Sequence, residues 1–396
     1  MPPAPLTPPP PAAVQGRFRA MIKPGGAQCN LDCRYCYYLP KQALLEQARS
    51  PRMSDEMLER HIAQFIAAQS GDEVVFSWQG GEPTLLGLDF FRQVVALQAR
   101  YKRPGQRIEN DLQTNGTLLD ADWAVFLKTH RFLVGLSCDG PARLHDVYRV
   151  SKGGQPTHAK VVAAARLLRQ HEIPFSVLCV VNRENARYPL DVYRFLTREL
   201  GARQLQLIPC VEPLGYDRTR LPDPADAAAV TEWSVTADDW GRFLCKVWDD
   251  WRARDVGKVF VNLFENQVAQ ALGYPSQQCV TAEFCGKGLA LEHNGDVFCC
   301  DHYVYPDYRL GNIAETPWAA MAYGQRQQAF AFAKRDTLTE TCRACRHLER
   351  CWGDCPKNRF ARTADGESGV SYLCRGLQIY YDHSQKTLPE LLRRIR

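Results

Sequence analysis

The sequence CNLDCRYC, residues 29–36, places Cys29, Cys33 and Cys36 on one short loop just past the first apolar run of the chain. Three thiolates on a tight loop can hold three irons of a [4Fe–4S] cluster, because thiolates are the usual ligands of such clusters. The fourth iron is then left open to bind a small molecule. A zinc knuckle is the alternative, but zinc prefers four ligands, and no fourth Cys or His follows within the loop. The spacing therefore favours an iron–sulfur cluster with one open iron.

The composition excludes several classes of protein. The chain has 396 residues, enough for two domains or for one domain with an extension, and a net charge of only +5. There is no concentrated basic stripe, so we expect no nucleic-acid partner. No run approaches the roughly 18 apolar residues of a membrane span, and the Pro- and Ala-rich N-terminus does not resemble a signal peptide. We therefore expect a cytoplasmic protein that binds no membrane.

The chain contains 16 cysteines. Structural disulfides are rare in a reducing cytoplasm. Clustered thiols in such a compartment usually bind metal. The cysteine groups are therefore the main guide to function.

Short apolar runs alternate with helical patterns from residue 17 onward. This alternation predicts parallel βαβ units and an α/β fold, with the chemistry at the carboxyl ends of the strands. The pattern alone does not separate an open sheet from a partial barrel. The predicted strands are 18–22, 74–78, 108–113, 132–137, 175–181 and 205–208, and the predicted helices are 54–69, 88–101, 120–129, 157–171 and 186–200, with Ser54 as an N-cap.

The character of the sequence divides the chain into five parts. Residues 1–15 are Pro-rich and predicted to be disordered. The alternating pattern occupies 16–235 and ends with a polar linker at 223–229; a helical connector follows at 236–278, with a helix at 237–253. Residues 279–375 are loop-rich and contain nine of the 16 cysteines, so we expect their fold to depend on metal. Residues 376–396 are predicted to form a C-terminal helix.

A second set of cysteines occupies the loop-rich part. Four of them have the spacing Cys-x2-Cys-x5-Cys-x3-Cys, for which a zinc ribbon is the alternative interpretation. Together with the cysteines around them they supply eight thiolates, the number that two fully ligated [4Fe–4S] clusters need. The eight are Cys279, Cys285, Cys300, Cys342, Cys345, Cys351, Cys355 and Cys374; Cys138, Cys179, Cys210 and Cys245 are predicted to be buried spectators, and Cys299 is ambiguous.

The loop CNLDCRYC, followed by QGGEP at 79–83, resembles the signature of the radical S-adenosylmethionine (SAM) superfamily, and the later cysteines resemble its SPASM extension. The resemblance implies a partial (β/α)6 barrel followed by a SPASM domain with auxiliary clusters. It also implies that SAM binds the open iron and yields a 5′-deoxyadenosyl radical. By the family pattern, Cys279, Cys285, Cys300 and Cys355 hold the nearer auxiliary cluster, and Cys342, Cys345, Cys351 and Cys374 hold the outer one, which makes three [4Fe–4S] clusters.

Five blocks of sequence narrow the resemblance to one branch of the superfamily: QGGEPTL (79–85), LQTNGTLL (112–119), LVGLSCDGP (133–141, with DGP at 139–141), LCVVN (178–182) and CDH (300–302). They look like anaerobic sulfatase-maturating enzymes, which oxidise a Cys or Ser of a sulfatase to Cα-formylglycine. The resemblance implies a sulfatase partner with a Cys/Ser-x-Pro-x-Arg motif and an electron donor such as flavodoxin or ferredoxin. It makes Asp301 the general base, ahead of His302, and it implies contacts with SAM for Tyr38, Gly81, Ser137, Arg149 and Val211.

Two other functions share some of these features. A SPASM peptide maturase that forms thioether or carbon–carbon cross-links would have the same cysteines, but only about 15 Pro-rich residues precede the first predicted strand, which disfavours an N-terminal peptide-recognition domain. An electron-transfer or cluster-carrier protein would need neither the open-iron loop nor QGGEP. The sequence leaves open whether the target residue is Cys or Ser.

Overall fold

The computed structural model describes residues 18–214, 230–286 and 288–395. The predicted disordered segment 1–15 and the predicted linker 223–229 lie outside the described residues. None of the helices in these three ranges is both long enough and apolar enough to cross a membrane.

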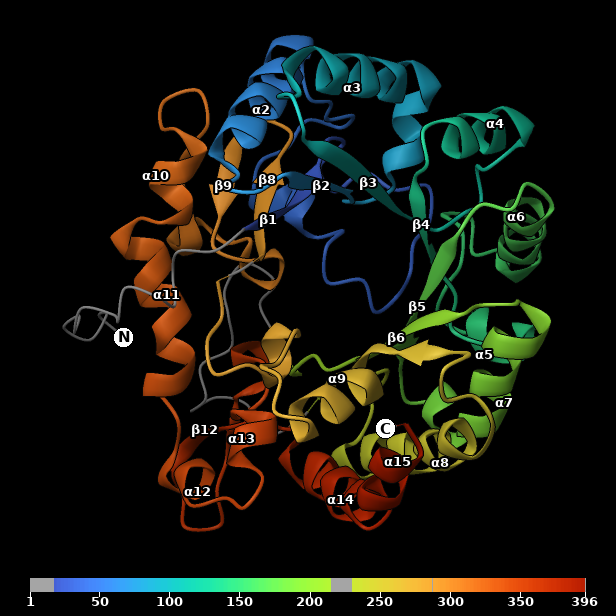
Figure 1. Ribbon diagram of the computed structural model, residues 1–396, viewed down its shortest axis with the longest axis vertical. Coiled ribbons are helices and arrows are strands. Elements are labelled where there is room, and N and C mark those ends of the chain that lie inside the picture. Colours follow the sequence, from blue (N-terminus) through green and yellow to red (C-terminus); the bar gives the residue numbers. More distant parts are fainter. Residues whose placement is uncertain (1–17, 215–229, 287, 396) are drawn as a thin grey trace.

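A ten-stranded sheet, in the order β10-β9-β8-β1-β2-β3-β4-β5-β6-β7, forms the centre of the described structure. The strands from β8 to β7 run parallel to one another, and β9 and β10 extend one edge with antiparallel pairing. The strands follow an arc with helices on its outer side (Figure 1). The strands are β1 (Arg19–Lys23), β2 (Glu73–Trp78), β3 (Arg107–Thr114), β4 (Leu133–Ser137), β5 (Phe175–Val181), β6 (Gln204–Pro209), β7 (Phe260–Val261), β8 (Gly288–Glu292), β9 (Asp296–Phe298), β10 (Arg309–Asn312) and a separate pair, β11 (Ala361–Arg362) and β12 (Ser368–Val370).

All six predicted strands are confirmed as β1 to β6, with ends that shift by at most two residues. Ser54 caps α2 as predicted, because its side chain accepts a hydrogen bond from the Met57 backbone N–H. The helices are α1 (Lys41–Leu44), α2 (Asp55–Ala68), α3 (Gly87–Tyr101), α4 (Ala121–Thr129), α5 (Ala142–His145), α6 (His158–Gln170), α7 (Pro189–Arg194), α8 (Ala237–Arg254), α9 (Asn262–Ala271), α10 (Trp318–Ala322), α11 (Gln325–Asp336), α12 (Glu340–Arg343), α13 (Leu348–Cys351), α14 (Cys374–Gln385) and α15 (Leu388–Ile395).

Two predicted helices are divided in the structure. The pattern at 186–200 becomes a short turn, α7 and a π-helical turn at Phe195–Glu199. Helix α7 begins at Pro189, which has no N–H to donate and is favoured at a first helical position. The C-terminal pattern becomes α14 and α15, because the ring of Pro389 clashes with the carbonyl four residues earlier, at Gln385, where α14 ends.

The loop-rich character predicted for 279–375 is only partly confirmed, because β8, β9 and β10 come from this segment. Strand β8 pairs in parallel with β1, so that Arg19 lies opposite Gly288 and Lys23 opposite Glu292. Leu289, Leu291 and nearby apolar side chains of these strands are fully buried in the main core. The cysteine-rich part therefore continues the same sheet as the rest of the chain.

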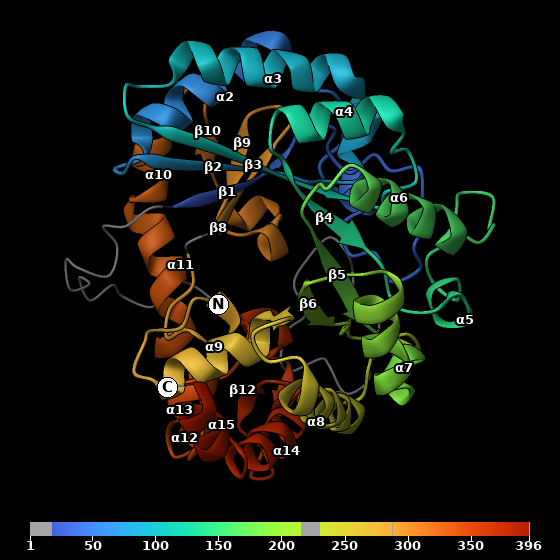
Figure 2. The same ribbon diagram turned by 45° about the vertical axis from the view of Figure 1, so that its right-hand side comes forward.

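Helices α8 and α14 close the opposite end of the molecule (Figure 2). They approach so closely that a Cβ atom added to Gly376 would lie 1.9 Å from the carbonyl oxygen of Ala237. Glycine allows this contact because it has no side chain. Helix α14 begins at Cys374, so this contact holds the end of the cysteine-rich segment against α8.

Candidate active site and metal centres

The first cysteine loop lies directly after β1, at the carboxyl edge of the parallel strands. Two backbone hydrogen bonds fix it, from Asp32 N–H to the Val150 carbonyl (2.9 Å) and from Arg34 N–H to the Tyr148 carbonyl (3.1 Å). Cys36 donates its N–H to the carbonyl of Cys33 (2.9 Å), so the loop is tightly turned.

The three thiols of this loop are mostly shielded from water and close to one another. Burial raises the pKa of Cys29 and of Cys33 to about 12, and the neighbouring thiols add to both increases. Burial also raises the pKa of Cys36. Three thiolates in such a place need a cationic partner, because burying charge without compensation is costly. The donor set therefore fits three corners of an iron–sulfur cluster.

Gly81 brings the end of β2 against the cysteine loop. Its N–H donates to the Gly26 carbonyl (2.9 Å), and the next N–H, of Glu82, donates to the Gln28 carbonyl (2.8 Å). A Cβ atom on Gly81 would lie only 1.9 Å from the Gln28 oxygen. Only glycine fits at this position, which lets the end of β2 pack against the cysteine loop; the contact of Gly81 with SAM stays a prediction.

Glu82 and Asn115 support the loop, and sequence reasoning gave neither a role. Glu82 is almost fully buried and accepts hydrogen bonds from Asn115 N–H and from the Thr114 hydroxyl, both at 2.7 Å. The Asn115 side chain donates to Asn30 (2.8 Å) and contacts the Cys29 sulfur at 3.8 Å. Both residues lie inside blocks that carried the family resemblance, which is the signal that could have identified them.

Arg149 lies beside the same loop, and its contact with SAM stays a prediction. Its Nε pairs with the Asp139 carboxylate at 3.1 Å, and the Tyr35 hydroxyl donates to that carboxylate. The Arg149 charge acts on Cys33, where it opposes the rise in pKa that burial causes. Ser137, at the end of β4, accepts a hydrogen bond from Gln113 (3.0 Å) two residues before Asp139. Sequence reasoning gave no role to Tyr35 or Asp139.

Tyr38 and Val211 have other partners in the structure. The Tyr38 hydroxyl donates to Glu292, and its ring lies 4.3 Å from the Lys23 ammonium. The Val211 side chain belongs to the main core, while its carbonyl accepts a hydrogen bond from Lys357 (3.4 Å). Their contacts with SAM stay predictions.

Asp301, the expected general base, is buried in a polar cluster. The cluster connects β1 and the first cysteine loop to the turn after Cys300. Lys23 of β1 forms an ion pair with its carboxylate, and the Tyr37 hydroxyl donates a hydrogen bond to it. Burial on its own would raise the pKa of Asp301, but the Lys23 charge and the hydrogen bonds from Lys23 and Tyr37 outweigh it, so the pKa lies below its usual value. The carboxylate is therefore ionised at neutral pH.

His302 is a weaker candidate for the base. Burial lowers its pKa to about 4. Its Nδ1 lies 3.6 Å from the sulfur of Cys355. The ring is therefore neutral and directed at an expected cluster ligand.

The structure gathers four cysteines next to Asp301. Burial is the main cause that raises the pKa of each thiol, and in three of them the other members of the group raise it further. Cys355 lies with this group, although its sequence neighbours belong elsewhere. The group consists of Cys279, Cys285, Cys300 and Cys355, the set expected for the nearer auxiliary cluster.

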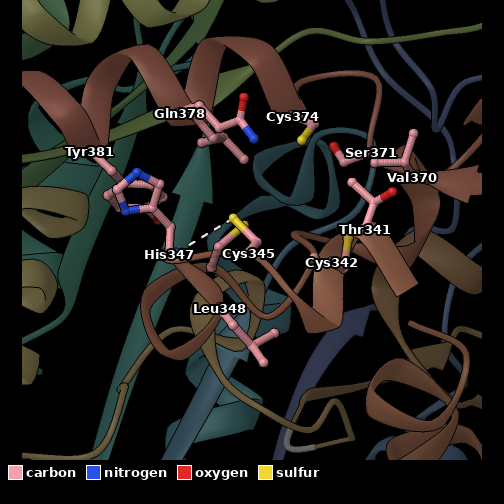
Figure 3. A pocket seen from close by; sticks show the side chains of 13 residues that line it. Thr341, Cys342, Cys345, His347, Leu348, Val370, Ser371, Cys374, Gln378 and Tyr381 are labelled. Carbon is pink, nitrogen blue, oxygen red and sulfur yellow. Dashed lines mark hydrogen bonds between the residues drawn. The ribbon is translucent and has the colours of Figure 1, made fainter. Parts of the chain in front are cut away.

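A second group of four lines a small cavity between α12, α13 and α14. Figure 3 shows Cys342, Cys345 and Cys374 around this cavity, and Cys351 also lines it. The His347 N–H donates to the Cys345 sulfur at 3.4 Å. After burial, Cys342 and Cys345 are the largest causes that raise the pKa of Cys374, to about 11. These four are the set expected for the outer cluster, and they line one small cavity.

The remaining five cysteines are not expected ligands, although Cys210 belongs to a small apolar cluster against which Cys33 of the first loop packs. Cys299, directly after β9, is buried; Gln327 donates to its carbonyl (3.1 Å), and burial raises the pKa of its thiol while the Arg326 charge opposes this increase. Cys138, Cys179, Cys210 and Cys245 are all buried, as expected of spectators. Among the described residues, no three His, Cys, Asp or Glu side chains converge tightly enough to hold a single metal ion.

Comparison with known proteins identifies the family. Residues 24–196 match the radical SAM superfamily, and residues 279–346 match a family described as an iron-sulfur cluster-binding domain, SPASM. A serine-type anaerobic sulfatase-maturating enzyme of Bacteroides thetaiotaomicron is 42% identical, over 92% of this chain and 88% of the relative. This chain belongs to the anaerobic sulfatase-maturating enzymes.

A cysteine-type member of the same family, from Clostridium perfringens, is 31% identical over 92% of this chain and 95% of its own. A solved structure described as native anSMEcpe with bound AdoMet and Cp18Cys peptide is similar to the present chain. The TM-score is 0.83 and the identity 30%, over 96% of this chain and 99% of the other. The expected fold, a radical SAM partial barrel with a SPASM domain, is confirmed, as are the enzyme class, a radical SAM oxidoreductase, and the cofactors, SAM and iron–sulfur clusters. Sulfatase maturation, the function expected from the sequence, is confirmed at the level of the family.

Proposed function

We propose that this enzyme oxidises a Cys or Ser side chain of a sulfatase polypeptide to Cα-formylglycine under anaerobic conditions. The observation that carries the proposal is the buried, ionised Asp301, held by Lys23 and Tyr37 directly after Cys300. A base in this position lies between β1, which leads into the first cysteine loop, and the nearer group of four. When bound, SAM and the clusters supply abstraction of hydrogen from carbon and an acceptor for the electron that the substrate loses.

The first cysteine loop and its neighbours hold the radical source. Cys29, Cys33 and Cys36 ligate the SAM-binding cluster. Gly81 lets the end of β2 pack against the cysteine loop, and the family pattern implies that backbone groups at this strand end bind the SAM amino group. Arg149 offers directional donors to a carboxylate or a ribose. Ser137, Tyr38 and Val211 complete the SAM contacts that the family pattern implies.

Asp301 accepts a proton from the target residue. Hydrogen is first removed from Cβ of the substrate Cys or Ser, and the thiol or hydroxyl proton then moves to a carboxylate oxygen of Asp301. The electron that remains leaves the substrate, and its carbon–sulfur or carbon–oxygen bond becomes double. A Ser target gives the aldehyde directly, whereas a Cys target gives a thioaldehyde that water hydrolyses.

The eight later cysteines hold two auxiliary clusters in the grouping found above. Cys279, Cys285, Cys300 and Cys355 ligate the nearer cluster, and Cys342, Cys345, Cys351 and Cys374 ligate the outer one. This grouping is supported by the pKa increases that members of a group cause in one another. The corresponding division of the chain is a barrel at 16–235, a connector at 236–278, a SPASM domain at 279–375 and a C-terminal helical part at 376–396.

The substrate carries a Cys/Ser-x-Pro-x-Arg motif, and an electron donor such as flavodoxin or ferredoxin reduces the SAM-binding cluster. We place the enzyme in the cytoplasm. Its 16 cysteines, all free of disulfides, support this location.

The test uses full-length protein reconstituted with iron and sulfide in the absence of oxygen. SAM, dithionite and a short peptide with the Cys or the Ser form of the motif are added, and 5′-deoxyadenosine and peptide are measured by mass spectrometry. A hydrazide reagent then labels an aldehyde, whereas it leaves a thioether or carbon–carbon cross-link unlabelled. Deoxyadenosine without a labelled peptide would retain the radical chemistry and contradict sulfatase maturation.

Asp301→Asn tests the base. The variant should cleave SAM at a rate close to that of the wild type and lose most of the aldehyde, by a factor of about 10² or more. A full yield of aldehyde from Asp301→Asn would remove Asp301 from this role.

A further inference from the structure

Asp354 lies between the two groups of auxiliary cysteines. It follows Cys351, a member of the outer group, and precedes Cys355, a member of the nearer group. Its backbone has a positive φ of 63°, which turns the chain sharply at this point. Its side chain is buried, with 8% of the residue exposed.

Two hydrogen bonds fix the Asp354 carboxylate. Its Oδ2 accepts from the Asn358 amide (2.9 Å), in the turn after Cys355, and from the Ser371 hydroxyl (2.8 Å), in the turn before Cys374. One oxygen atom is therefore bonded to a segment of each group. In agreement with this position, Asp354 adds to the rise in pKa of Cys355 and Cys279 and also of Cys351 and Cys374.

Lys334 lies on the side of the nearer group. It comes from α11 and is 1% exposed. Its ammonium donates to the carbonyls of Cys279 (2.6 Å) and Val280 (3.0 Å) and to that of Ala282. These three acceptors match the three donors of an ammonium group. The buried cation is thus built into the Cys279 turn.

We propose that Lys334 and Asp354 set the reduction potentials of the two auxiliary clusters: Lys334 stabilises the reduced form of the nearer cluster, and Asp354 destabilises the reduced form of both. A cluster that takes up one electron becomes more negative by one charge. A buried cation favours that change and a buried carboxylate opposes it, since charges interact strongly where water is excluded. The nearer cluster therefore accepts the electron from the substrate more readily than the outer one. The inference rests on the ligand grouping in the proposed function.

The test is an EPR-monitored redox titration in a background that lacks the SAM-binding cluster, Cys29→Ala with Cys33→Ala and Cys36→Ala. This protein should contain about eight irons per chain, and its two auxiliary clusters should titrate in separate one-electron steps. Cys374→Ala in the same background identifies the step of the outer cluster. An iron content near four would contradict the ligand grouping and, with it, the inference.

Lys334→Met should lower the ratio of reduced to oxidised nearer cluster about tenfold at a fixed applied potential, equivalent to about 59 mV for one electron. The outer cluster should not shift, and Lys334→Arg, which keeps the charge, should restore the potential. Asp354→Asn should raise both potentials. Lys160→Met, which changes an exposed lysine of α6, is the matched control and should change neither.

Three results would overturn the inference while the clusters remain present: an unchanged nearer potential in Lys334→Met, an equal shift of both clusters in that variant, or no rise of either potential in Asp354→Asn. If Lys334→Met loses iron, Asp354→Asn decides the matter, because it retains the shape of the side chain. These results leave the proposed function intact, since they concern potentials and not the reaction product.

Discussion

Lys23 and Asp301, 278 positions apart in the sequence, form a buried ion pair that connects the first strand to the turn after Cys300. Lys23 is the last residue of β1, and the first cysteine loop begins six residues later. The pair therefore joins the strand that leads into the first cysteine loop to the turn that carries the proposed base. It also gives Lys23 a role that its place in a strand does not suggest.

Lys23→Met should uncouple radical formation from product formation. Without the cation, burial would raise the pKa of Asp301, so that a larger fraction of the carboxyl would already be protonated and unable to accept the substrate proton. We expect aldehyde formation to fall about tenfold, with less change in 5′-deoxyadenosine, because the base contributes a factor of about 10² to 10⁴. Lys23→Arg should recover part of the yield. An unchanged ratio of aldehyde to deoxyadenosine in Lys23→Met would show that the ion pair does not support the base.

Gly81→Ala should disrupt the SAM-binding cluster selectively. The added Cβ would lie 1.9 Å from the Gln28 oxygen, so the cysteine loop must move away from β2. Of about twelve irons expected for three clusters, about four should be lost, and SAM cleavage should stop. Gly153→Ala is the control, because a Cβ there meets its first neighbour only at 3.9 Å. Full iron content and normal SAM cleavage in Gly81→Ala would contradict this account of the loop.

Cys355→Ala should change the nearer cluster, despite its position in the Cys-x2-Cys-x5-Cys-x3-Cys segment. Its thiol lies with Cys279 and Cys285, whose charges raise its pKa after burial. The EPR spectrum of Cys355→Ala should therefore lose or alter the same signal as Cys300→Ala, while Cys351→Ala alters the other. If Cys355→Ala and Cys351→Ala affected the same signal, the grouping would be wrong.

His61 should make the protein less stable in mild acid. Burial lowers its pKa to about 3, and its Nδ1 accepts a hydrogen bond from the Trp318 indole (3.2 Å), which requires a neutral ring. The unfolded chain binds a proton at about pH 6.5, so this contribution to stability is complete above that pH. It is lost at about 1.4 kcal/mol per pH unit as the pH falls toward 3.

The measurement for His61 compares melting temperatures of the wild type and His61→Asn from pH 7 to pH 4.5. At pH 7 the variant should have a lower melting temperature than the wild type, because the smaller side chain leaves a cavity. Its melting temperature should then fall less steeply as the pH is lowered. His130→Asn, at an exposed position, serves as the control. Parallel slopes for the wild type and His61→Asn would rule out His61 as the source of acid sensitivity.

The barrel strands and the first cysteine loop were predictable because their signals are local. Residues 175–181 form one apolar run, and the structure has β5 over the same residues. The packing of Gly81 against the Gln28 backbone was not predicted, because a glycine pair after a strand does not show what approaches it. The gathering of Cys355 with Cys279 was implied only by the family pattern, since spacing within one segment does not reveal contacts with another.

The contacts that complete the site were not predictable, because they depend on long-range pairing. In the sequence, β8 is a short apolar run within a loop-rich segment. No residue pattern next to it in the sequence indicates that it pairs in parallel with β1. Lys23 and Tyr37 reach Asp301 only once that pairing exists. Pro389 is a local signal for the division of the C-terminal helix into α14 and α15. The prediction of one helix followed the helical pattern on both sides of Pro389 instead.

The parallel pairing of β8 with β1 fixes the distance between the first cysteine loop, where we propose that the radical forms, and Asp301, which we propose removes the proton. Five consecutive residue pairs, from Arg19 with Gly288 to Lys23 with Glu292, set the alignment of the two halves. A slip by one residue would displace the downstream turn by about 3.3 Å and turn its side chains to the opposite face. An insertion of a single residue in either strand should thus abolish turnover even where every ligand and the base are retained.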